Sequence, residues 1–168
     1  VSRHEKPTLS IAGAWAGNKG NCSRWSSSGC GGLDGLGADT ANDNRYEIDQ
    51  AVAEVAYKHQ GLSIQSEYHW KNVDDDQTGL DHDYEGAYAQ AGYFFNEINK
   101  SIPEELELAF RYAFVDEPDS TGSNLLLKNN REEYTVAANW FIAGHGNKVT
   151  LDYSHLTLDD ASGNRGFE

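Results

Sequence analysis

The chain has 168 residues, with 13 Lys and Arg against 27 Asp and Glu and a formal net charge of −14 at pH 7. No nucleic-acid partner is expected, because binding to phosphates requires clustered cations and the sequence contains no basic cluster. No apolar run approaches the ~18 residues of a membrane-spanning helix, but the alternating strands of a membrane barrel would escape this test because their average hydropathy is low.

Alternation of apolar and polar residues predicts seven β-strands and almost no helix. The clearest strand has Leu62, Ile64 and Trp70 on one face and Glu67 and His69 on the other. In chain order, the predicted strands contain residues 9–15, 51–58, 62–70, 87–95, 106–114, 134–140 and 149–154. Counted to the adjoining turns they are roughly nine to fifteen residues long, at or above the length that a tilted strand needs to cross the hydrocarbon core of a bilayer.

The links between these strands are expected to alternate in length. Hairpin-sized links are expected at 59–61 and 144–147, and an intermediate link at 96–104. Long links are expected near 17–44, 72–83, 116–130 and 157–168. Because alternate links of an up-and-down meander lie at the same end, the long links would share one rim, as the external loops of outer-membrane barrels do.

Charged and amide side chains lie in mid-strand, opposite unbroken apolar rows, so their face is expected to meet water. Aromatic residues gather toward the strand ends, where the interfacial girdles of membrane barrels lie. The pattern therefore predicts an all-β fold, an antiparallel transmembrane β-barrel with outer-membrane lipid against its apolar rows. Since an open sheet edge cannot lie in lipid, 1–168 is expected to be one segment of a larger barrel.

Four runs of the sequence, 87–95, 105–116, 131–141 and 147–155, resemble the C-terminal half of the phosphate-selective porin O and P family. Most similar is the order of motifs: Arg-Tyr-x-x-Val-Asp ending one strand, a variable loop, then Asn-Trp, a short turn and Asp-Tyr. The resemblance extends over about residues 45–160. It implies a bacterial outer-membrane porin, a homotrimer of barrels with about 16 strands each, which passes small ions and other solutes, phosphate or other anions among them, and performs no enzymatic chemistry. The chain would then be a fragment of a longer porin.

The side chains that alternate with the apolar rows are the expected pore lining. They are Glu54, Lys58, Gln65, Glu67, Glu107, Arg111, Asn139 and Asp152. Carboxylates outnumber basic groups in this set, and rings of carboxylates favour cations. A general or cation-preferring pore is therefore kept as an interpretation beside an anion pore.

One acidic segment matches the spacing of a calcium loop. Asp74, Asp76, Thr78 and Glu85 stand where such a loop has ligands, and Gly79 stands at its sharp turn. Calcium is the one cofactor that the sequence suggests, in an external loop. The competing interpretation is a solvated acidic surface loop.

Cys22 and Cys30 lie in a Gly/Ser-rich stretch without a nearby His, so no metal spacing is present, and a local disulfide is favoured over two free thiols. The stretch from Gly29 to Gly37 is expected to be an external loop that can fold into the lumen as a constriction.

Catalytic motifs are not recognisable, since the six His are scattered and the Ser-rich run lacks a nucleophile context. Two other function classes stay open. One is a barrel that sheathes a protein partner, and the other is a soluble β-barrel or sandwich that binds a ligand.

Overall fold

A computed structural model describes residues 4–26, 29–31, 36, 45–117, 130–143, 146–159 and 165–167. Within them, one antiparallel sheet has the strand order β1-β4-β5-β6-β7-β8-β9-β10. The strands are β1 (Thr8–Gly20), β4 (Tyr46–His59), β5 (Leu62–Asp75), β6 (Leu80–Tyr93), β7 (Leu106–Asp116), β8 (Asn130–Phe141), β9 (Lys148–Asp159) and the short β10 (Arg165–Phe167). A separate small hairpin joins β2 (Arg24–Ser26) to β3 (Gly29–Gly31), and η1 (Phe95–Glu97) is a short 3-10 helix.

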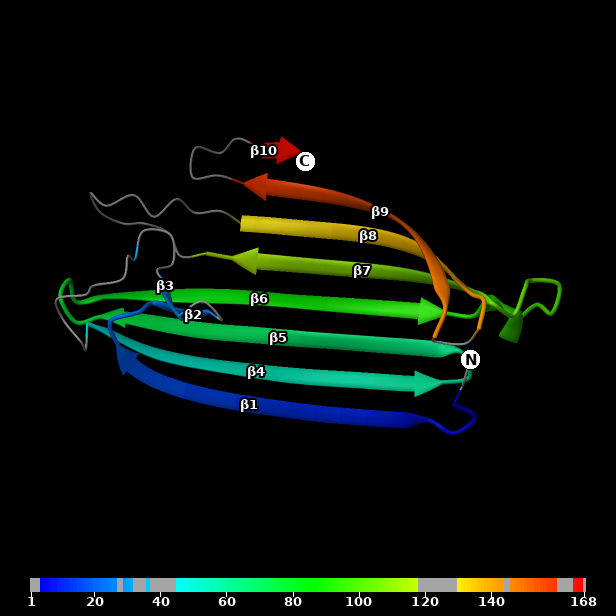
Figure 1. Ribbon diagram of the computed structural model, residues 1–168, viewed down its shortest axis with the longest axis horizontal. Coiled ribbons are helices and arrows are strands. Elements are labelled where there is room, and N and C mark those ends of the chain that lie inside the picture. Colours follow the sequence, from blue (N-terminus) through cyan, green and yellow to red (C-terminus); the bar gives the residue numbers. More distant parts are fainter. Residues whose placement is uncertain are drawn as a thin grey trace.

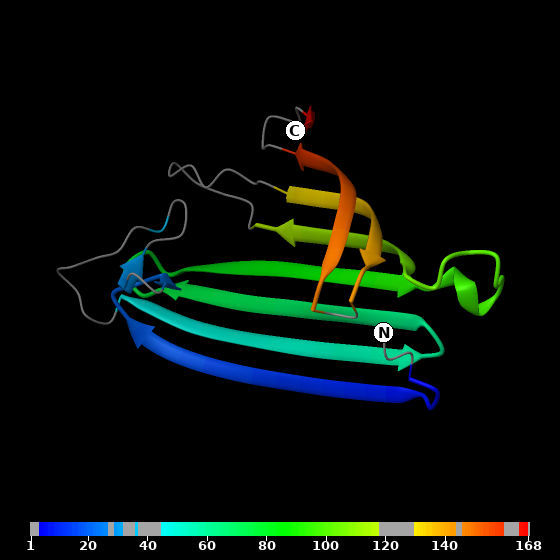
Figure 2. The same cartoon turned by 45° about the vertical axis from the view of Figure 1, so that its right-hand side comes forward.

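The seven long strands lie side by side in chain order (Figure 1). Six of the seven predicted strands fall inside one of them, and the seventh, 87–95, runs two residues past the end of β6 at Tyr93. The all-β, antiparallel prediction is confirmed. The strands at the ends of the order, β1 and β10, do not pair with each other, and the described sheet is open. It is also curved, so that β8 and β9 turn away from the plane of β4 to β6 (Figure 2).

The predicted long link at 72–83 is wrong. Strand β5 continues to Asp75 and β6 begins at Leu80, so most of this stretch is paired strand and only a tight turn remains. At the opposite end, the link between β6 and β7 contains η1 and is longer than that turn. The links therefore do not sort strictly by length between the two ends. These strand ends are rich in Asp, which is uncommon in strands, so the local sequence pattern favours a loop here.

The predicted hairpin at 59–61 is confirmed as a two-residue turn. Gln60 and Gly61 both have positive φ, +44° and +82°, which is the signature of a type I′ turn between antiparallel strands. The backbone of Gly61 also accepts a hydrogen bond from the N–H of Phe94, at 3.1 Å, and so ties the turn to the start of the next link.

The sheet has no central core among the described residues. A small buried cluster, made of Leu36, Tyr46, Ile48 and Val73, lies at the end where β1 leads into β4, and the buried Phe94 and Phe141 lie at the other end. In contrast, one whole face of the sheet exposes large apolar side chains, such as Ile11 at 75% and Leu151 at 76%. The fold therefore owes its order mainly to the strand ladder, because little apolar surface is buried within it.

Gly61→Ala should lower the free energy of unfolding by about 1–2 kcal/mol, because a side chain disfavours the left-handed backbone conformation. The added Cβ would also lie 2.9 Å from Cγ of Glu97 and 3.3 Å from Cβ of Phe94. Gly79→Ala is the matched control, since its φ is +67° but nothing lies within 4 Å of the added atom. Denaturant titration of both variants checks this, and an equal or larger loss for Gly79→Ala would contradict it.

Candidate functional site

The cross-strand register brings the eight predicted lining residues to one face of the sheet. Glu54 lies opposite Glu67, and Gln65 and Arg111 both lie opposite Gln90. Lys58 pairs with Ser63, Glu107 with Asn139, and Asp152 with Ala137. Because facing residues in a ladder point to the same side, all eight belong to this face, which is called the polar face below.

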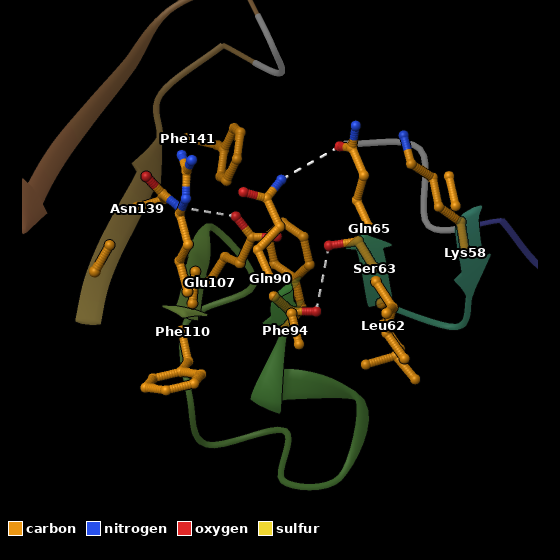
Figure 3. Close-up of a pocket in the computed structure, with 18 of the residues that line it drawn as sticks. Lys58, Leu62, Ser63, Gln65, Gln90, Phe94, Glu107, Phe110, Asn139 and Phe141 are labelled. Carbon is orange, nitrogen blue, oxygen red and sulfur yellow. Dashed lines mark hydrogen bonds between the residues drawn. The ribbon is translucent and has the colours of Figure 1, made fainter. Parts of the chain in front are cut away.

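A hollow of about 580 Å³ lies on the polar face, near the end of the sheet where the 60–61 turn is. Figure 3 shows Lys58, Gln65, Gln90, Glu107 and Asn139 extending to the same side of the sheet. Leu62 and Phe110 extend to the opposite side. The hollow is therefore lined by polar side chains from β4 to β8, by Lys148 at the start of β9 and by apolar residues between them.

Basic groups predominate among the charged side chains of this hollow. Lys58, Arg111 and Lys148 line it, with Glu107 as the acidic group. Glu107 accepts a hydrogen bond from the amide of Asn139 at 2.9 Å. Among the described residues, no ion pair joins any of these three cations to a carboxylate. This part of the polar face is thus locally positive although the chain as a whole is acidic.

Sequence reasoning missed Lys148 and Gln90 as part of this face. Lys148 begins β9 immediately before Val149, so extending the alternation of that strand by one residue would have placed it there. Gln90 stands between alanines in β6, and it donates a hydrogen bond to Gln65 at 3.3 Å. Its own strand gave only a weak alternation, which is why its direction was not predicted.

Carboxylates align in the next part of the polar face. Glu54 and Glu67 lie directly opposite each other, an arrangement of like charges that destabilises a sheet. The Glu67 carboxylate accepts hydrogen bonds from the Tyr88 hydroxyl at 2.5 Å and from Gln65 at 3.5 Å, and His69 lies 3.1 Å from it. These contacts stabilise the Glu67 carboxylate beside Glu54 and keep this part of the polar face acidic.

The link between β1 and β4 contacts the polar face at the end of the sheet opposite the 60–61 turn, which is called the rim below. Leu36 is buried against Ile48 and Val73, which point to this face. The Ser23 hydroxyl donates to the carbonyl oxygen of Leu36 at 2.6 Å, and the Lys71 ammonium donates to that of Ser23 at 2.7 Å. The constriction predicted for residues 29–37 lies mostly outside the described residues, but Leu36 contacts the polar face.

A buried ion pair between Arg45 and Asp75 links β4 to β5 at the rim. Asp75 ends β5, five residues past Trp70, and lies outside the stretch of β5 that carries apolar side chains. The Arg45 guanidinium donates to both carboxylate oxygens of Asp75, at 3.0 and 2.8 Å. Burial disfavours the charged carboxylate, but hydrogen bonds from Arg45, the Gln77 N–H and Thr78 outweigh it and hold the pKa of Asp75 below its usual range.

The other face of the sheet, called the apolar face below, has aromatic side chains near both ends of an aliphatic band. Toward the rim they are Trp15, Tyr68, Trp70, Tyr112, Phe114 and Tyr134, and toward the opposite end Tyr57, Tyr93 and Trp140. Past the rim-side aromatics this face becomes polar, with Asn72 donating to Asp83 at 3.0 Å. The apolar band is therefore bounded, as in a surface that meets a bilayer.

The calcium-loop prediction is not supported by the geometry. Asp76 and Thr78 lie in the turn, and Asp76 contacts the Lys19 ammonium at 2.6 Å. Glu85 pairs with Trp70, five residue pairs along the strand from the last pair before the turn, or about 17 Å away. Asp74 and Glu85 are thus held apart by the ladder, and the described residues contain no group of three or more potential metal ligands.

Cys22 is disulfide-bonded and buried. Cys30 is the other cysteine of the chain, and its backbone pairs with that of Trp25 in the β2–β3 hairpin. The side chain of Cys30 lies outside the described residues, so its pairing with Cys22 stays a prediction.

Comparison with known proteins identifies one family. The family model described as phosphate-selective porin O and P matches residues 35–166, which include the 45–160 of the sequence resemblance. No curated protein and no solved structure matches the chain significantly. Among the described residues, no helix is long and apolar enough to cross a membrane.

Asp75→Asn should lower the free energy of unfolding at neutral pH by about 2 kcal/mol, because it removes a charged partner from buried hydrogen bonds. A carboxyl with a lowered folded-state pKa stabilises fully above its unfolded pKa, near ~3.9, and loses this effect as the pH falls through the folded value. The difference between wild type and variant should therefore become smaller as the pH falls below ~3.9.

Urea titrations from neutral pH down to about pH 3 measure this difference. Asp74→Asn is the control, because its side chain points to the apolar face and is not bound to Arg45. Burial and the neighbouring carboxylates raise the pKa of Asp74, so this variant should not lose stability at neutral pH. A difference between wild type and Asp75→Asn that stays constant down to the lowest pH would contradict the role given to the ion pair.

Proposed function

The chain belongs to the phosphate-selective porin O and P family, and we propose that it forms part of the wall of an outer-membrane pore through which small solutes diffuse. The members of this family are non-enzymatic porins of the outer membrane. The polar face would line the lumen and the apolar face would meet lipid. The bounded apolar band supports this orientation, because water-facing sheets do not expose such a band.

The open sheet supports a larger barrel. The backbone groups along the free side of β1 lack a neighbouring strand in the described sheet. In hydrocarbon such groups must be paired, so strands outside the described sheet would complete the wall. The homotrimer implied by the sequence resemblance stays a prediction.

The hollow beside the 60–61 turn supports the passage of anions, phosphate among them. Lys58, Arg111 and Lys148 line it without a described carboxylate partner, and this is the observation that carries the proposal. Cations that are not neutralised by the protein attract solute anions, and guanidinium and ammonium groups both bind phosphate oxygens.

A cation-preferring pore is the second candidate. Glu54 and Glu67 face each other on the polar face, and Glu133 lies in the same cross-strand row, opposite Ala113. Aligned carboxylates favour cations. The two candidates differ in which group of charges controls the solute, so ion selectivity decides between them.

Reversal potentials in a planar bilayer, with the full-length protein in a KCl gradient, test this arrangement. Arg111→Gln should shift the reversal potential toward cation selectivity, and Glu67→Gln should shift it toward anion selectivity, because each removes one charge from the lumen. Glu132→Gln is the matched control, since Glu132 lies on the apolar face and contacts Tyr112. No shift from either lumen variant would contradict the pore lining.

Added phosphate separates the two candidates. Block of the chloride current by phosphate, weakened in Lys58→Gln and Arg111→Gln, is expected for the anion pore. A cation-selective channel that phosphate does not block would support the porin function and contradict a role in phosphate passage. Verified insertion without conductance would favour the protein-sheathing barrel instead.

Leu108→Arg should destabilise the protein in lipid by about 2–4 kcal/mol if Leu108 lies near the bilayer midplane, because the charge would enter hydrocarbon. Leu108 is half-exposed on the apolar face. Ala109→Arg is the control, since its neighbours Gly92 and Ala137 are on the polar face, where the charge would meet water. Folding titrations in lipid vesicles measure both, and equal stabilities would contradict the orientation of the sheet.

A further inference from the structure

Tyr88 stands between two opposite charges of the polar face. It lies in β6, which separates β5, carrying Glu67, from β7, carrying Arg111 (Figure 1). Its hydroxyl donates to Oε1 of Glu67 at 2.5 Å. The guanidinium carbon of Arg111 lies 4.7 Å from the centre of its ring. One side chain therefore contacts an anion with its polar tip and a cation with its ring.

Without this ring, the two charges would be free to meet. Glu67 and Arg111 are separated by one intervening strand and by two residues along the ladder, or about 10 Å across the sheet and about 7 Å along it. Arginine and glutamate side chains together are long enough to cover this distance, and a bidentate ion pair between them would be favourable at a partly desolvated surface. Such a pair would cancel one positive and one negative charge of the lumen.

The other neighbours of Glu67 and Arg111 do not lie between the carboxylate and the guanidinium. Glu67 also contacts Gln65 and His69, which are on its own strand. Arg111 lies opposite Gln90 and Thr135, which carry no charge. Tyr88 is thus the side chain that fills the space between the carboxylate and the guanidinium.

We propose that Tyr88 is a positioning residue that keeps Glu67 and Arg111 from pairing with each other, so that both act as charges of the pore wall. The hydroxyl fixes the carboxylate on one side, and the ring holds the guanidinium by a cation–π contact on the other. The pore therefore presents both signs of charge within a short length of wall. The proposal rests on the porin function given above, because only in a lumen do these charges act on solutes.

The test is a set of reversal potentials for the full-length protein in a planar bilayer with a KCl gradient. The shift caused by Glu67→Gln is measured in the wild-type and in the Tyr88→Leu background. In the wild-type background, Glu67→Gln should shift the reversal potential by the amount expected for an unpaired carboxylate. In the Tyr88→Leu background this shift should be about half as large or smaller, because Glu67 is then paired with Arg111. Adding Arg111→Gln to Tyr88→Leu should restore it, since no cation remains to pair.

Two further variants separate positioning from general damage. Tyr88→Phe keeps the ring under Arg111 and should retain most of the Glu67→Gln shift. Tyr112→Leu removes a tyrosine whose hydroxyl also donates to a glutamate, Glu132 at 3.2 Å, but on the apolar face, and should leave the shift unchanged.

The outcomes are distinguishable. Equal Glu67→Gln shifts in the wild-type, Tyr88→Leu and Tyr88→Phe backgrounds would overturn the positioning role and leave the porin function standing. An inserted wild-type protein that does not conduct would overturn the porin function and this proposal together. If Tyr88→Leu does not fold, loss of the shift in Tyr88→Phe would overturn the role given to the ring.

Discussion

The register of the antiparallel ladder is the constraint on which the rest of this structure depends. Side chains alternate between the two faces of a sheet, so a slip of one residue would move every lining residue to the opposite face. The pairing of Glu107 with Asn139 and of Lys58 with Ser63 therefore also fixes which face of the sheet carries the polar side chains. The two-residue turn at Gln60 and Gly61 helps to hold this register between β4 and β5, because it allows only one alignment of their ends.

Positive and negative side chains are unevenly distributed along the polar face. The local charge of each part of this face therefore differs from the net charge of the chain. Basic groups line the hollow beside the 60–61 turn, whereas Glu54 and Glu67 lie farther toward the rim. Opposite charges on one wall tend to pair, which would leave a nearly neutral surface. Here neutral side chains stand between them, with Tyr88 in direct contact with Glu67 and Arg111. The sheet thus keeps charges of both signs on its polar face without an ion pair between Glu67 and Arg111.

The rim differs from the rest of the polar face because the chain folds back onto it. Leu36 covers Ile48 and Val73, and the backbone of Ser23 accepts a hydrogen bond from Lys71. The ion pair of Arg45 with Asp75 closes the same end of the sheet. Apolar burial and buried ionic contacts therefore concentrate at this end of the sheet, and the middle of the polar face remains polar. This distribution leaves the ladder as the main source of order along most of each strand.

The sequence alone determined the seven long strands and the division into a polar and an apolar face, because a period of two is a local property of each strand. It also determined the family through motifs such as Arg-Tyr-x-x-Val-Asp, which ends at Asp116. Tertiary structure decided the rest. The Asp-rich segment around Asp76 is a tight hairpin whose ladder carries Glu85 away from the turn, and local spacing could not reveal that pairing. The joining of Lys58, Arg111 and Lys148 in one hollow depends on strands distant in sequence becoming neighbours, which only the pairing of whole strands brings about.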